Sequence, residues 1–181
     1  MVVVFFAEGF EEVEALATVD VLRRAKIEVK MIGIHEKLVR GSHGISVEMD
    51  GGFEDIGSID NVQCIVLPGG IPGATNLKAS AKVGEWLKKA ESNGKYVAAI
   101  CAAPIVIGHF GIMEGKKFTC YPSFEKELPN HLHIPESVVT DGKLITAKGV
   151  GVALDFGLEI VKHLKDPITS DTLRAQMMMR N

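Results

Sequence analysis

Two residues of this chain could together carry out covalent and proton-transfer chemistry: a cysteine, Cys101, and a carboxylic acid, Glu14. Cys101 follows the apolar run 96–100, which predicts a buried strand, and precedes Pro104, which is typical of the first turn of a helix. The N–H groups of a helix N-terminus favour negative charge, so this position predicts a thiol pKa below the ordinary value of about 8.5. The competing interpretation is a small, inert core residue.

Glu14 lies in the segment 10–25, whose apolar residues recur with the period of a helix. One face of this predicted helix holds Glu14 together with Phe10, Val13, Ala17 and Val21, whereas Glu11 and Glu12 point elsewhere. A carboxyl group on a core-facing stripe loses solvation, which raises its pKa unless a cation or a hydrogen-bond donor compensates. The other interpretation is a residue at the border of the stripe whose carboxylate reaches solvent.

The composition predicts a single domain spanning 1–181, of ordinary globular type, with 46% hydrophobic and 24% charged residues. A net charge of -3 without a long Lys/Arg run gives no footprint for nucleic acid or an anionic membrane. Three widely spaced cysteines argue against a disulfide framework or a structural zinc site and favour a reducing cytoplasm. The N-terminal run Met1–Phe6 lacks a basic leader and predicts a strand rather than a signal peptide.

Strands alternate with helices along the chain, which predicts an α/β fold with a doubly wound, mainly parallel sheet and helices on both faces. Hairpins are expected at 38–47 and around Asp141-Gly142. Ser170 is expected to cap the last helix. The predicted strands are 2–7, 27–34, 63–67, 96–100 and 118–120, and the predicted helices are 10–25, 74–77, 82–92, a segment from 104 and a segment ending at 164.

A glycine-rich loop, Pro68 to Gly73, follows the strand 63–67 and allows backbone N–H groups to approach a ligand closely. It matches neither G-x-G-x-x-G nor the phosphate loop, so nucleotide binding is disfavoured. Ligands of such sheets collect outside the carboxyl ends of the parallel strands, where Glu14, Gly69-Gly70 and Cys101 are all expected. A thiol, a carboxyl group and N–H donors that stabilise an oxyanion form a coherent catalytic set.

Several segments occur in an ordered combination: 11–14 with 19–25, 67–70 with 73–74 and 76–77, 98–104, and 149–151. In this combination the chain resembles the ThiJ/PfpI superfamily, and within it the branch of the parkinsonism-associated protein deglycase. The resemblance covers essentially the full length and implies a flavodoxin-like fold, usually a homodimer, with Cys101 at a strained nucleophile elbow. It implies that Glu14 is a protonated carboxyl bonded to the cysteine and that Gly70 and Ala102 supply oxyanion-hole N–H groups.

The sequence departs from the family pattern at three positions around the expected pocket. Ala102 stands where the protease-like branch has a histidine, so a Cys-His peptidase lacks its base. Tyr121 stands where the deglycase branch has a histidine near the cysteine, and His43 stands where many relatives have an arginine at the pocket mouth. Together with Gly69 and Cys120, Tyr121 and His43 are the candidate pocket residues.

The resemblance implies a glutathione-independent glyoxalase or deglycase acting on small carbonyl substrates, namely 2-oxoaldehydes or their early protein adducts, without a metal or organic cofactor. The alternative is a redox-sensing or chaperone-like stress protein whose Cys101 is oxidised and held by Glu14. Cys120 then either traps a sulfenic acid as a disulfide or is a buried strand thiol. His131 and His133 are a further metal-chelating alternative, and a cysteine peptidase is the least favoured function.

Overall fold

The computed structural model describes residues 1–179 and contains a six-stranded sheet in the order β2-β1-β5-β6-β10-β9. Every neighbouring pair is parallel except β9 and β10, which form the hairpin predicted around Asp141-Gly142. The doubly wound, mainly parallel fold class is thereby confirmed. The strands are β1 (Val2–Phe6), β2 (Val29–Gly33), β5 (Cys64–Leu67), β6 (Tyr96–Ile100), β9 (Val138–Asp141) and β10 (Leu144–Ala147).

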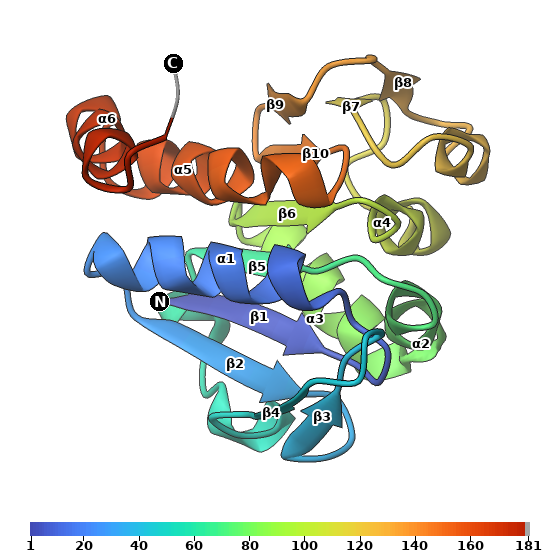
Figure 1. Cartoon of the computed structure of the whole chain (residues 1–181). Coiled ribbons are helices and arrows are strands. Elements are labelled where there is room, and N and C mark those ends of the chain that lie inside the picture. Colours follow the sequence, from blue (N-terminus) through green and yellow to red (C-terminus); the bar gives the residue numbers. More distant parts are fainter. Residues whose placement is uncertain (180–181) are drawn as a thin grey trace.

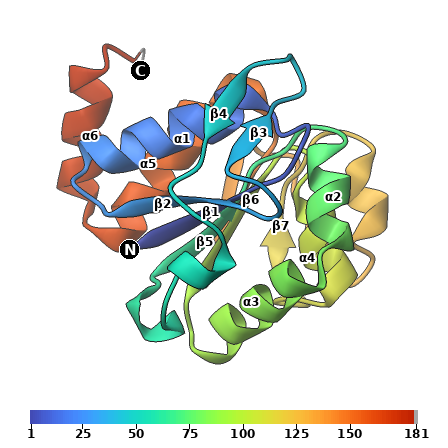
Figure 2. The same cartoon turned by 90° about the horizontal axis from the view of Figure 1, so that it is seen from below.

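Helices cover both faces of this sheet, as Figures 1 and 2 show. One face carries α1 (Glu12–Arg24), α5 (Ala153–Leu164) and α6 (Pro167–Gln176), and the other carries α2 (Gly73–Ala79), α3 (Ala81–Ser92) and α4 (Pro104–Phe110). Alternate strand residues enter the two cores: Val2, Val4 and Phe6 face α1 and α5, while Val3 and Phe5 face the opposite layer. This two-sided burial explains why the strands are continuously apolar in sequence.

Two small two-stranded sheets, β3-β4 and β7-β8, accompany the main sheet. The predicted first hairpin is present as antiparallel β3 (Leu38–Arg40) and β4 (Ser46–Glu48). The expected strand 118–120 is shorter and shifted, because β7 (Lys117–Phe118) pairs with β8 (Leu132–His133) and ends before Cys120. No helix within residues 1–179 is long and apolar enough to cross a membrane.

Three local predictions, on Val13, Leu154 and Ser170, were wrong. Val13 is 53% exposed, because α1 begins only at Glu12 and Phe10 packs in the preceding loop against Phe6. Leu154, expected in the core by its spacing in the helix ending at 164, is also exposed. Ser170 does not cap the last helix: the carboxylate of Asp166 accepts from the backbone of Thr169, and Ser170 lies inside α6.

Candidate active site

Cys101 lies at the joint between β6 and α4 in a strained backbone conformation. Its φ of +63° lies in the left-handed region, which non-glycine residues adopt rarely and at a cost of about 1–3 kcal/mol. Its N–H donates to the carbonyl of Ala147 at 2.8 Å, and its carbonyl accepts from the N–H of Tyr121 at 2.9 Å. The strained elbow is therefore held from β10 on one side and from the loop after β7 on the other.

Glu14 lies in the first turns of α1 and is almost completely buried, with 1% of its surface exposed, so the border interpretation fails. Its Oε2 accepts from the N–H of Gly69 at 3.0 Å. Its Oε1 is buried and has no hydrogen-bond partner within residues 1–179, and Cys101 is the neighbouring thiol that influences the pKa of this carboxyl. Glu14 is thus fixed on one side by a backbone amide and faces the thiol on the other.

The ionisation of this thiol and carboxyl is coupled. Burial raises the pKa of Glu14 to about 7, and burial together with the negative charge of Glu14 raises the pKa of Cys101 to about 12. The predicted low thiol pKa is wrong, because α4 starts three residues further on and its N-terminus does not offset these two effects. Between the two pKa values the pair therefore shares a single proton.

Two backbone N–H groups act in the opposite direction and stabilise negative charge on the sulfur of Cys101. They belong to Ala102 and Gly70, the residues expected to supply an oxyanion hole, and their hydrogen bonds lower the pKa of the thiol. Gly70 has a φ of +90°, which turns the loop after β5 toward the elbow. Groups that stabilise a thiolate from this side are also placed to stabilise an oxyanion formed next to it.

Gly69 allows the close approach of Glu14 and Cys101. A Cβ at this position would lie 2.6 Å from Cys101 Cβ and 2.9 Å from the carbonyl oxygen of Ile100, and would also overlap Glu14 Oε2. All three neighbours are rigid or buried, so no side chain can move aside cheaply. Gly69 is therefore required sterically between the two reactive groups.

We expect Gly69→Ala to destabilise the protein by about 1–3 kcal/mol, because the new methyl group overpacks the site. It should also weaken any activity that depends on the contact between Glu14 and Cys101. Urea unfolding measures the first effect. Gly151→Ala is the matched control, since a Cβ there meets no atom within 4 Å and the backbone is not left-handed. Equal stability of the two variants would contradict the steric role of Gly69.

His43 is hydrogen-bonded to Glu12, a buried carboxylate that is the first residue of α1. His43 donates its backbone N–H to Glu12 Oε1 at 2.7 Å, and its Nδ1 lies 2.8 Å from Oε2. Burial alone would raise the pKa of Glu12, but the hydrogen bonds from His43 outweigh it and hold the value at about 2. This pairing ties the turn of the β3–β4 hairpin to α1, just before Glu14.

Glu12 was not predicted as a site residue, because on a helix beginning at Phe10 it points away from the face that holds Glu14, whereas α1 begins at Glu12 and buries it. Glu11, Glu12 and His43 bring potential metal-ligand atoms within 4.8 Å of one another, but Glu12 and His43 already satisfy each other. The other histidine pair is not arranged as a chelate, since His131 is buried and its Nε2 bonds to the carbonyl of Ile112 at 2.9 Å.

The contact between Glu12 and His43 should make the stability of the hairpin depend on pH. The pKa of His43 is raised from 6.5 by its hydrogen bond and charge pairing with Glu12. The contribution of His43 to stability is therefore complete below pH 6.5 and is lost as pH rises through the higher pKa of the folded state. The lowered pKa of Glu12 gives a contribution to stability that is complete above pH 4.5 and is lost as pH falls toward about 2. We therefore expect His43→Gln to lower the melting temperature most between about pH 4.5 and 6.5. A pH-independent difference would contradict this.

The remaining candidate pocket residues reach the elbow only in part. Tyr121 contacts Cys101 through its backbone, while its side chain is half exposed and packs edge-on against Phe124. Cys120 is buried and unpaired, and burial together with the charge of Glu125 raises the pKa of its thiol to about 12. Cys64 is likewise free and fully buried, as expected for a core residue.

Comparison with known proteins gives a consistent result along most of the chain. A family model described as the DJ-1/PfpI family matches residues 1–163. Protein dj-1beta of Drosophila melanogaster is 39% identical over 164 residues, which cover 89% of this chain and 87% of that protein. The glutathione-independent glyoxalase DJR-1.2 of Caenorhabditis elegans is 31% identical over 168 residues, covering 92% and 89%. The crystal structure of Drosophila melanogaster DJ-1beta aligns with a TM-score of 0.95 at 35% identity, over 99% of this chain and 98% of that chain.

Proposed function

This chain belongs to the DJ-1/PfpI family, and from this premise we propose that it is a cysteine-dependent, glutathione-independent glyoxalase or deglycase. Its substrates are small 2-oxoaldehydes such as methylglyoxal, or the early adducts that these form with protein side chains. The observation that carries the proposal is the buried carboxyl group of Glu14, held by the Gly69 N–H at 3.0 Å and facing the thiol of Cys101. No metal or organic cofactor is required by this chemistry.

The reaction begins when the sulfur of Cys101 adds to the aldehyde carbon of the substrate. The thiol proton passes to the carboxylate of Glu14, whose pKa of about 7 makes it both a competent base and a competent acid near neutrality. The aldehyde oxygen becomes an oxyanion, which the N–H groups of Gly70 and Ala102 stabilise before it is protonated. The product of this step is a hemithioacetal.

Glu14 then moves a proton between the two former carbonyl carbons of the substrate. Removing the proton from the carbon bound to sulfur gives an enediol, and protonating the neighbouring carbon gives a 2-hydroxyacyl thioester. Water attacks the thioester and releases the 2-hydroxy acid together with the free thiol of Cys101. The sum is the addition of one water molecule to the 2-oxoaldehyde, with no external oxidant or reductant.

Tyr121 should limit the rate of this reaction, because it supplies no imidazole at a place where many relatives have one. A positioned general acid or base typically contributes about 10²–10⁴-fold, so its absence slows the reaction without ending it. The peptidase function is weakened further, since Ala102 offers no base next to the nucleophile.

The test is the consumption of methylglyoxal by freshly reduced protein without glutathione, with D- and L-lactate both quantified. Turnover that produces lactate in a 1:1 ratio with the aldehyde consumed supports the proposal. Aldehyde loss that stops at one equivalent per protein chain would instead indicate simple trapping by thiols and amines.

The competing function is a redox sensor that stores oxidised Cys101 against Glu14. Both functions use the same thiol beside Glu14, and they are separated by their response to peroxide. A sensor would acquire a defined oxidised species at low peroxide and change its binding behaviour. An enzyme of the proposed type would only lose its turnover.

A homodimer is part of the same proposal. Val13 in α1 and Ile45 in the β3–β4 hairpin are 53% and 55% exposed. Glu12 of α1 accepts from the N–H of Ile45 at 3.4 Å, and this bond joins the two elements. Such neighbouring apolar side chains are typical of an interaction surface. Light scattering on the protein and on Val13→Asp tests it, with dissociation expected in the variant. The location in the cytoplasm follows only from the free thiols and stays a prediction.

A further inference from the structure

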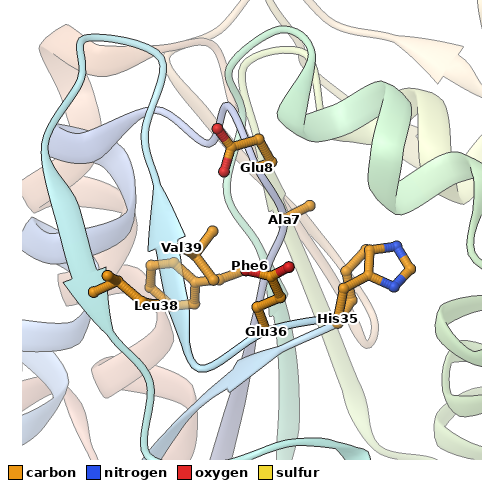
Figure 3. Close-up of a pocket in the computed structure, with 8 residues that line it drawn as sticks. Phe6, Ala7, Glu8, His35, Glu36, Leu38 and Val39 are labelled. Carbon is orange, nitrogen blue, oxygen red and sulfur yellow. The ribbon is translucent and has the colours of Figure 1, made fainter.

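A separate cavity lies at the carboxyl ends of β1 and β2, under the β3–β4 hairpin (Figure 3). Its volume is about 280 Å³, and neither Cys101 nor Glu14 is among the residues that line it. Sheets of this type bind ligands beyond the carboxyl ends of their parallel strands. A second small ligand at this part of the edge is therefore compatible with the fold.

The inner wall of the cavity is apolar. Phe6 and Val39 are buried and come from β1 and β3, while Leu38 lines the same cavity and is 62% exposed. Covering Leu38 with an apolar ligand would remove this surface from water, which is favourable in proportion to the area covered. The volume suits a ligand with a single ring or a short branched chain.

The polar side chains that line the cavity are two carboxylates and one imidazole. Glu8 and Glu36 both line it, from the end of β1 and from the turn before β3, and His35 is adjacent in the same turn (Figure 3). One oxygen of Glu8 accepts from the N–H of Arg40 at 3.2 Å, and neither carboxylate takes part in an ion pair within residues 1–179. No lysine or arginine lines the cavity.

We propose that this cavity binds a small amphiphilic amine. Its apolar body packs against Phe6, Leu38 and Val39, its ammonium group donates hydrogen bonds to the carboxylate of Glu36, and Glu8 adds a second negative charge to the lining. Charge-assisted hydrogen bonds of this kind are stronger than those between neutral groups. The site is independent of the reaction proposed at Cys101.

Three probes with the same aromatic body and different end groups test the proposal: 2-phenylethylamine, 2-phenylethanol and 3-phenylpropionate. We expect NMR titration to show the amine binding about tenfold more tightly than the alcohol, with the largest amide shifts at Phe6 and Val39. The carboxylate should bind most weakly. Equal affinities for the three probes, or shifts confined to residues around Cys101, would overturn the proposal.

Charge reversal at Glu36 gives the decisive comparison. Glu36→Lys should reverse the preference, so that 3-phenylpropionate binds more tightly than the amine. Glu28→Lys makes the same charge change at an exposed position of the loop before β2, outside the cavity, and should leave the preference unchanged. Cys101→Ser should also leave it unchanged, which separates this result from the fate of the glyoxalase proposal. If Glu36→Lys retains the amine preference while its circular dichroism is unchanged, the site does not exist as proposed.

Discussion

Cys101→Ser is expected to lower kcat/KM for methylglyoxal by at least about 10³-fold, because a serine hydroxyl cannot replace a thiol that must add to the aldehyde and later leave from an acyl intermediate. The substitution removes the nucleophile and leaves Glu14, Gly70 and Ala102 in place. Measurement of lactate release over a range of enzyme concentrations gives the residual rate. Retention of more than a tenth of the activity would show that turnover arises elsewhere.

Cys120→Ser is the matched control for this experiment. Cys120 is the nearest cysteine in sequence, is buried, and has a thiol whose pKa is raised to about 12, as is that of Cys101. It lacks the strained backbone of Cys101, and the carboxyl group near it is Glu125 rather than Glu14. We expect its activity to remain within about threefold of the unmodified protein, since no step of the mechanism uses it. A large loss would revive the idea that Cys120 and Cys101 act as a redox pair.

Much of this site could be predicted from the sequence because its parts follow strand ends. The apolar runs before Cys101 and before Gly69 locate two strands whose carboxyl ends must meet at one edge of the sheet. The glycines at 69 and 70 predict close backbone approach, and the structure shows Gly69 between Glu14 and Cys101. The predicted burial of Glu14 is confirmed as well.

The ionisation of the site and its support by the hairpin could not be predicted in the same way. A helix N-terminus after Cys101 suggested a low thiol pKa, but burial and the charge of Glu14, a residue 87 positions away in sequence, decide the outcome. The partner of Glu12 was missed for a similar reason, because His43 lies in a hairpin turn that is 31 residues distant. Helical periodicity describes one element, whereas desolvation and long-range hydrogen bonds depend on how elements pack.

Glu14→Gln is expected to reduce kcat/KM by about 10²–10⁴-fold, since the amide neither accepts the thiol proton nor moves a proton between substrate carbons. The same variant tests the coupling of the two groups. Below pH 7 the protein retains both protons of the pair, so kcat/KM should rise about tenfold per pH unit up to about 7 and then level off. Glu14→Gln should lose this rise, whereas Asp20→Asn, on the exposed side of α1, should keep both the rate and the pH profile.

The stability of the same variant should move in the opposite direction to its activity. The pKa of Glu14 is raised from 4.5 to about 7 on folding, so its contribution to stability is fully present below 4.5 and is lost as pH rises through about 7. Ionising this buried carboxyl costs as much as about 3 kcal/mol, whereas a glutamine has no charge to bury. We therefore expect Glu14→Gln to melt at a higher temperature than the unmodified protein at about pH 8 and at a similar temperature near pH 4. A variant that is less active but no more stable at about pH 8 would show that the pKa of Glu14 is not raised on folding. The proton-sharing mechanism would then lose its physical basis.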